Sequence, residues 1–296
     1  MVGSPAPPSA TATPPPAAPG ARTYTFYAHA PISARNTTPA GYVRALRERS
    51  DWADGLFLYY PASLEFGARP EIDALQDAYP AGVPLTVSAK NADAAGVAAF
   101  RDQLTPEQAA VTLWERWQEP ADDFTTPSER ALFRANVLAD IEILRPAGVR
   151  VGVHEQCWTL DPANVKPWAG EQALLELIPP EVDIVTASCV GRQPESSGPP
   201  QMQRFLDFMT EHYPGVDVGF TMLAWSVPAG TPAGSAERED RAAAAREAIE
   251  FVTAAGVTEM GWFDFADWEG RDTAVASDPS LLRLLSEISA RPARIR

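Results

Sequence analysis

Short stretches rich in β-branched and aromatic residues alternate with longer amphipathic stretches along most of this 296-residue chain. The strand-like stretches lie at residues 23–30, 55–62, 84–90, 110–117, 149–156, 182–190, 216–225 and 259–266. Helical patterns separate them, for example at residues 38–53, 128–148, 237–256 and 278–290, and several begin with Ser or Thr before Pro or Glu. Strands separated by helices pair in parallel through right-handed crossovers, so the alternation indicates an α/β protein.

The number of repeating units distinguishes between two α/β architectures. Eight strand–helix units in about 270 residues match the size of a closed (β/α)8 barrel. The alternative, an open doubly wound sheet, usually has a Gly-rich phosphate-binding turn after its first strand. Here that segment reads HAPISARNTTPAG, without a G-x-G-x-x-G motif. We therefore predict a single (β/α)8 TIM barrel over residues 22–296, preceded by a Pro-rich disordered tail at residues 1–21.

The tail, MVGSPAPPSATATPPPAAPGA, is a Pro/Ala/Ser/Thr tract that cannot bury apolar surface, and we interpret it as an extended linker. It lacks the charged and apolar regions of a signal peptide. Such tracts often join modules of secreted or virion-associated proteins, so we expect an extracellular or virion-associated location, in bacteria or phages, and a larger assembly as partner. No apolar run approaches the length of a transmembrane helix, so no membrane insertion is expected.

Charge and cysteine content restrict the possible ligands. The net charge is −15 and no dense Lys/Arg cluster occurs, which argues against a nucleic-acid interface and favours a neutral or cationic ligand. The three histidines and two cysteines form no set with zinc spacing, so we expect no metal and no cofactor. Cys157 and Cys189 lie near the ends of neighbouring predicted strands. Two buried free thiols are the expected state, and a disulfide is the alternative.

In a (β/α)8 barrel the chemistry lies where the strands end and the following loops begin. The predicted strand ends are aromatic, acidic and rich in amides. Aromatic faces stack on sugar rings, carboxylates and amides bind hydroxyls, and paired carboxylates cleave acetals, so we predict a carbohydrate ligand. The predicted substrate-binding residues are Gln118, His29, Tyr60, Lys90, His154, Trp225 and Trp268. A Schiff-base role for Lys90 in an aldolase-like barrel is a further alternative.

The stretch LWERWQEP, residues 113–120, contains two glutamates four positions apart on the fourth predicted strand. Strict alternation places residues 113, 115, 117 and 119 on one face. Glu119 then lies at the mouth of the barrel, and Glu115 lies one pleat lower, where burial requires a partner such as an arginine or an indole N–H. Pro120 ends the strand directly after Glu119.

LWERWQEP resembles the fourth-strand signature of a large clan of (β/α)8 glycoside hydrolases that includes cellulases, mannanases, β-xylosidases and α-iduronidases. Members commonly show Trp-Glu-x-Trp-Asn-Glu-Pro there, and the resemblance implies that Glu119 is the general acid/base. Gln118 takes the position of the asparagine that binds the sugar 2-hydroxyl. The stretch GWFDFADWEG, residues 261–270, is similar to the aromatic final strand of the clan, which implies that Trp262 or Trp268 floors a sugar subsite.

One feature departs from the clan, whose nucleophile is a glutamate at the end of the seventh strand. Here Met222 follows Thr221, and no carboxylate occurs between Asp217 and Glu237. Retaining hydrolysis needs a second carboxylate about 5 Å from the first, and inverting hydrolysis needs one roughly 6.5–9.5 Å away.

We predict Glu155 or Asp264 as this second catalytic residue, with Asp267 a poorer candidate. Two hypotheses stand side by side: a glycoside hydrolase acting on a polysaccharide or glycoside, or a non-catalytic carbohydrate-binding or structural barrel of a cell-surface or phage tail protein.

Overall fold

The computed structural model describes residues 24–29, 39–60, 69–89, 92–162, 164, 170–191, 198–264 and 271–290. The predicted tail at residues 1–21 lies outside these ranges.

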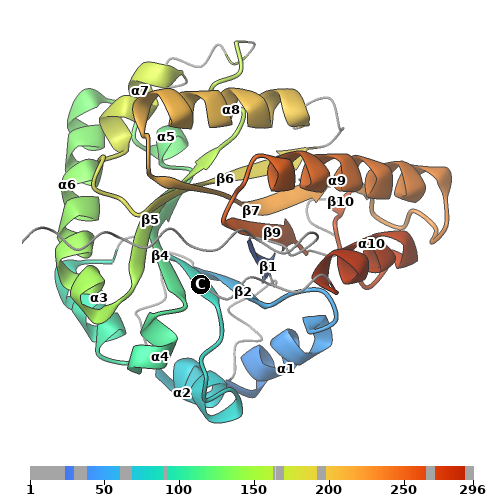
Figure 1. Ribbon diagram of the computed structural model, residues 1–296, viewed down its shortest axis with the longest axis horizontal. Coiled ribbons are helices and arrows are strands. Elements are labelled where there is room, and N and C mark those ends of the chain that lie inside the picture. The colour runs from blue at the N-terminus through green and yellow to red at the C-terminus, as the bar shows by residue number, and fades with distance from the viewer. Residues whose placement is uncertain are drawn as a thin grey trace, which may run out of the picture.

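Eight parallel strands close into a barrel in the order β1-β2-β3-β4-β5-β6-β7-β9, which confirms the predicted (β/α)8 architecture. All eight coincide with predicted strands, to within a few residues at each end. Figure 1 shows them at the centre of a ring of helices. The barrel strands are Thr25–His29 (β1), Gly55–Tyr60 (β2), Leu85–Ala89 (β3), Thr112–Gln118 (β4), Arg150–Gln156 (β5), Ile184–Gly191 (β6), Asp217–Trp225 (β7) and Glu259–Phe263 (β9).

The helices follow the strands in turn and form the outer layer (Figure 1). They are Pro39–Arg49 (α1), Arg69–Ala78 (α2), Ala94–Arg101 (α3), Pro106–Ala109 (α4), Pro120–Asp123 (α5), Pro127–Leu144 (α6), Glu171–Leu177 (α7), Pro199–His212 (α8), Ala236–Ala254 (α9) and Pro279–Ser289 (α10), with a 3-10 turn at Arg145–Ala147. Helix α6 begins with a full capping box, because the side chains of Thr126 and Glu129 each accept the other residue's backbone N–H.

Two short strands were not predicted from the sequence. β8 (Val227–Pro228) and β10 (Arg271–Asp272) pair antiparallel outside the barrel. A two-residue strand is too short to show a period-2 pattern. The buried Arg238 of α9 bonds to the Asp272 carboxylate, which ties this ribbon to the outer layer.

The apolar core lies between the strands and the helices. Trp114 of β4 packs on Phe100 of α3 with ring centroids 4.8 Å apart, and Phe220 of β7 packs on Phe205 of α8 at 5.9 Å. The indole N–H of Trp114 also donates to Asp140 of α6. These contacts show that the outward faces of the strands hold the helices in place.

The inward faces of the strands carry polar and charged side chains beside aromatic ones. At the end where the strands begin, which we call the floor, Arg150 of β5 forms ion pairs with Asp217 of β7 and Glu259 of β9. Burial raises the pKa of Glu259, and the charge of Arg150 opposes that shift. Arg150 therefore closes the floor by bridging strands that are not neighbours.

Register shifts occur near the opposite end, which we call the mouth. Between β4 and β5, Glu115 aligns with Gly152 but Gln118 aligns with His154, so β4 contains one extra residue. β7 shifts likewise against β6 and β9, around Phe220 and Thr221. The prediction that residues 113, 115, 117 and 119 share one face is therefore wrong, since alternation breaks after Glu115.

Cys157 and Cys189 form a disulfide with a Cα–Cα distance of 5.5 Å. The expectation of two free thiols is therefore wrong. The two cysteines lie one residue beyond Gln156 and Ser188, which are register partners on neighbouring strands. The disulfide thus joins β5 and β6 at the mouth.

In the part of the chain that the structure describes, no helix has both the length and the apolar composition needed to cross a membrane.

Candidate active site at the barrel mouth

A buried polar cluster lies in the lumen of the barrel and consists of Glu115, His154, Thr186 and Thr221. His154 Nδ1 lies 2.9 Å from the Thr186 hydroxyl, 3.2 Å from the Thr221 hydroxyl and 3.3 Å from a Glu115 carboxylate oxygen. These residues come from β4, β5, β6 and β7, so their side chains must converge inside the barrel. Glu115 is buried as predicted, but its partners are Thr186 and His154 rather than an arginine or an indole.

The arginine and the indole of the same strand bind a different acid. Arg116 and Trp114 face outward and both donate to Asp140 of α6, with Arg116 contacting both carboxylate oxygens at 2.6 Å. Burial raises the pKa of Asp140, and the Arg116 contacts oppose the shift.

Glu119 lies at the end of β4, where the chain turns into α5. Its backbone has φ 58° and ψ 53°, the only left-handed non-glycine conformation among the described residues. Such a conformation costs free energy and is found where a site requires it. The Glu119 N–H donates to the His154 carbonyl at 2.8 Å, and Pro120 starts α5. This turn fixes the direction of the half-buried Glu119 side chain.

The Glu119 carboxylate accepts a hydrogen bond from the hydroxyl of Ser188 on β6. Ser188 lies two residues beyond Thr186 of the lumen cluster, so it faces the lumen at the mouth. Glu119 does not cap α5 with its side chain. Its carboxylate is therefore turned toward the barrel axis rather than toward its own helix.

Glu155 points to the outside of the barrel. It follows His154, which faces the lumen, and its carboxylate accepts the backbone N–H of Ala121 in α5 at 3.0 Å. Burial raises the pKa of Glu155 well above its usual range, and the charges of Glu119 and Asp122 raise it further. The Glu155 carboxylate thus caps the start of α5, which the Glu119 side chain does not do.

Asp264 is also held away from the mouth. One carboxylate oxygen accepts the Val275 N–H at 2.8 Å, and the other forms an ion pair with Arg49 of α1 at 2.8 Å. Both predicted second carboxylates are therefore engaged in contacts with the outer layer.

The remaining predicted site residues have different surroundings. His29 is buried between Phe57 and Phe263, with ring centroids 4.7 and 4.9 Å away, and burial lowers its pKa to about 3. Trp225 is 2% exposed and packs on Trp262 at 6.0 Å. Lys90 and Trp268, as well as Asp267, lie outside the described residues, as do the side chains of Tyr60 and Gln118.

Asp122, Gln156 and Ser188 are not among the predicted site residues, although Gln156 and Ser188 lie at the ends of predicted strands. Gln156 donates its side-chain amide to the Asp122 carboxylate at 3.2 Å, next to the Ser188–Glu119 bond. Asp122 follows Glu119 by three residues, and Pro120 between them marks the start of a helix. The sequence therefore does indicate that the two acids lie in one turn. The exposed Trp158, directly after Cys157, is a further aromatic side chain at this end of the barrel.

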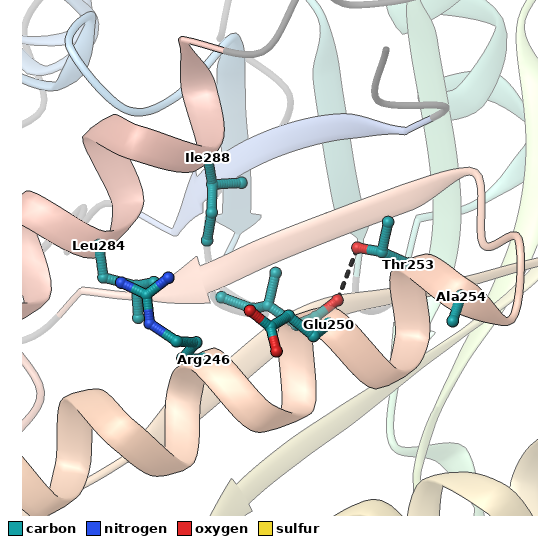
Figure 2. A pocket seen from close by; sticks show the side chains of 7 residues that line it. Arg246, Glu250, Thr253, Ala254, Leu284 and Ile288 are labelled. Carbon is teal, nitrogen blue, oxygen red and sulfur yellow. Dashed lines mark hydrogen bonds between the residues drawn. The ribbon is translucent and has the colours of Figure 1, made fainter. Parts of the chain in front are cut away.

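Two cavities lie in the outer layer. One of 210 Å³ separates α9 from α10, and Figure 2 shows Arg246 and Glu250 of α9 facing Leu284 and Ile288 of α10. The other, of 560 Å³, lies between α1 and α2. The first is near the end of α9 that leads to the floor, and neither contains a residue of the mouth. Within the described ranges, no group of three or more His, Cys, Asp or Glu side chains is arranged to hold a metal ion.

No protein-family model and no curated protein matches this sequence. Solved structures do match. A fungal β-1,4-galactanase structure has a TM-score of 0.58 and 13% identity over 90% of this chain and 100% of its own. The virulence factor SghA from Agrobacterium tumefaciens has a TM-score of 0.64 and 8% identity over 93% and 98%.

A β-D-glucuronidase from Dictyoglomus thermophilum has a TM-score of 0.62 and 12% identity, covering 93% of this chain and 51% of its own. This chain therefore spans about half of that enzyme. At such identities the likeness establishes the fold alone, a (β/α)8 barrel like those of these enzymes.

Proposed function

We propose that this protein hydrolyses a polysaccharide or a glycoside, with Glu119 as the proton donor. The observation that carries the proposal is the geometry of Glu119. A strained left-handed backbone places its carboxylate at the mouth, where Ser188 orients it. A left-handed conformation costs a non-glycine residue about 1–2 kcal/mol, and such strained residues cluster at active sites, which supports a functional direction for this side chain.

The comparisons support a carbohydrate ligand. Among the similar structures are SghA in complex with its substrate analogue salicin and a mutant Rhizomucor miehei β-1,3-glucanosyltransferase in complex with laminaritriose. The buried disulfide supports an extracellular location, because disulfides persist in oxidising compartments.

Substrates with different leaving groups test the role of Glu119. Glu119→Gln should lower the hydrolysis of unactivated glycosides by about 10²–10⁴-fold, because general acid catalysis is worth that much. A dinitrophenyl glycoside leaves without protonation, so its cleavage should fall far less. The control is Glu107→Gln, an exposed glutamate on α4, which should match the wild type. Equal losses on both kinds of substrate would contradict a proton-donor role.

A second candidate function is a non-catalytic carbohydrate-binding barrel. Strand β7, which is described in full, has its sole carboxylate at Asp217 on the floor and has the buried Met222 at the mouth end. Binding of a glycan without release of reducing sugar would favour this function.

A further inference from the structure

The proposed hydrolysis needs a second carboxylate at the mouth, and neither of the predicted candidates is available. Glu155 faces α5 on the outside of the barrel, and both oxygens of Asp264 are bonded to Val275 and Arg49. Strand β7 offers Met222 instead of an acid. The question is therefore which described carboxylate faces the same space as Glu119.

Asp122 lies one helical turn after Glu119. Its backbone N–H donates to the Glu119 carbonyl at 3.2 Å, so the two residues belong to the same tight turn. Glu119 directly precedes α5 and Asp122 lies within it, so the chain brings both acids to the end of β4.

Two adjacent strand residues turn both carboxylates toward the lumen. Gln156 of β5 and Ser188 of β6 are register partners, and neighbouring strands lie about 4.8 Å apart. Ser188 donates to Glu119, and Gln156 donates to Asp122. Both anchors lie two residues beyond lumen-facing residues, His154 and Thr186, so each holds its carboxylate at the mouth.

Buried polar atoms in the lumen below Glu119 and Asp122 are candidates for ligand contacts. Among the described residues, His154 Nε2 and Ser88 Oγ are buried without a hydrogen-bond partner. His154 belongs to the lumen cluster, and Ser88 is the register partner of lumen-facing Glu115. Buried polar atoms are normally paired, so these two favour a ligand with hydroxyl groups in the lumen.

We propose that Asp122 is the general base that works with Glu119, and this inference rests on the proposed function. Asp122 is exposed, so its carboxylate has access to water, whereas Glu119 is half-buried. Asp122 removes a proton from a water molecule, whose oxygen forms the new bond to the anomeric carbon. The bond from that carbon to the leaving oxygen breaks, and the leaving oxygen takes the proton of Glu119. The products are a sugar of inverted anomeric configuration and an alcohol, and solvent returns both carboxyl groups to their starting states.

The matched variants Asp122→Asn and Asp123→Asn test this assignment, because both change one exposed acid in α5 to its isosteric amide. On a substrate that the wild type cleaves, Asp122→Asn should lower kcat by about 10²–10⁴-fold with KM changed less than about threefold, whereas Asp123→Asn should match the wild type. NMR of the first-formed sugar should show the inverted anomer. Melting temperatures of both variants should equal that of the wild type, which separates lost chemistry from lost folding.

Failure of this inference differs from failure of the proposed function. If Glu119→Gln is impaired while Asp122→Asn is fully active, Asp122 is not the base and the role of Glu119 stands. A retained anomer likewise overturns the base role. If the wild type releases no sugar from any polysaccharide or glycoside offered, the proposed function fails and the assignment of Asp122 fails with it.

Discussion

Three glutamates near the mouth differ in role because their surroundings differ. Glu115 is enclosed by the lumen cluster, Glu155 supports α5 from outside the barrel, and Glu119 is turned toward the mouth by a strained backbone. The sequence indicated the positions of Glu115 and Glu119, because the motif and Pro120 indicate where the strand ends. It did not show the direction of the Glu155 side chain, which depends on which face of β5 is turned inward.

At the residue scale, Glu155→Gln should stabilise the protein at high pH. Because the pKa of Glu155 is raised in the folded state, the folded protein binds more protons above pH 4.5 and loses stability as pH rises through the folded pKa. Glutamine can still accept the Ala121 N–H and has no charge to bury. The free energies of urea unfolding should agree near pH 4 and favour the variant by about 1–3 kcal/mol at pH 8. A variant less stable than the wild type at pH 8 contradicts this account, and exposed Glu142→Gln is the control.

The buried His29 should give the opposite pH dependence of folding stability. Its folded pKa is lowered to about 3 from 6.5, so the unfolded chain binds the extra proton between these values. Stability should therefore fall as pH drops below 6.5, by up to about 1.4 kcal/mol per pH unit. His29→Phe keeps ring packing against Phe57 and Phe263 and removes the titration. Urea unfolding between pH 4.5 and 7 should show a shallower slope for the variant, and parallel curves would refute the assignment.

At the scale of elements, the end of β4 combines an extra residue with a left-handed turn. Neither is visible in the stretch LWERWQEP, because no residue in it marks where the extra residue is inserted or where the backbone turns left-handed. The strand was predicted correctly and the facing of its last residues was not. Asp122 could not be placed beside the mouth from the sequence for the same reason, because its position depends on how α5 leaves the strand.

The backbone strain at Glu119 can be measured with two variants that both remove the carboxylate. Glycine adopts the left-handed conformation without steric cost, whereas alanine does not. Glu119→Gly should therefore be more stable than Glu119→Ala by about 1–2 kcal/mol in urea unfolding. Equal stabilities would mean that the turn is not strained, and the main support for the proposed function would be lost.

At the scale of the whole molecule, the barrel was predictable because eight alternating strand and helix patterns leave few architectures. The pairing of particular side chains was not, because it depends on register shifts and on contacts between distant segments, such as Arg49 with Asp264. Two cysteines in the sequence do not show whether they face each other, so the sequence alone does not establish the disulfide.

The disulfide between β5 and β6 should stabilise the whole barrel. Closing a loop over a sequence separation of 32 residues typically contributes about 2–4 kcal/mol. Cys157→Ala/Cys189→Ala should lower the unfolding free energy by that amount and make it insensitive to reductant. Alkylation of the denatured, unreduced wild type should add no mass, and two adducts would show that the thiols are free.

We propose that the mouth of this barrel cleaves glycosidic bonds through Glu119. The most direct test measures the reducing sugar released from a panel of polysaccharides and glycosides by the wild type, Glu119→Gln and Glu107→Gln. We predict release by the wild type and by Glu107→Gln from at least one member, with a loss of about 10²–10⁴-fold for Glu119→Gln. Equal release by all three proteins, or release by none of them, would contradict the claim.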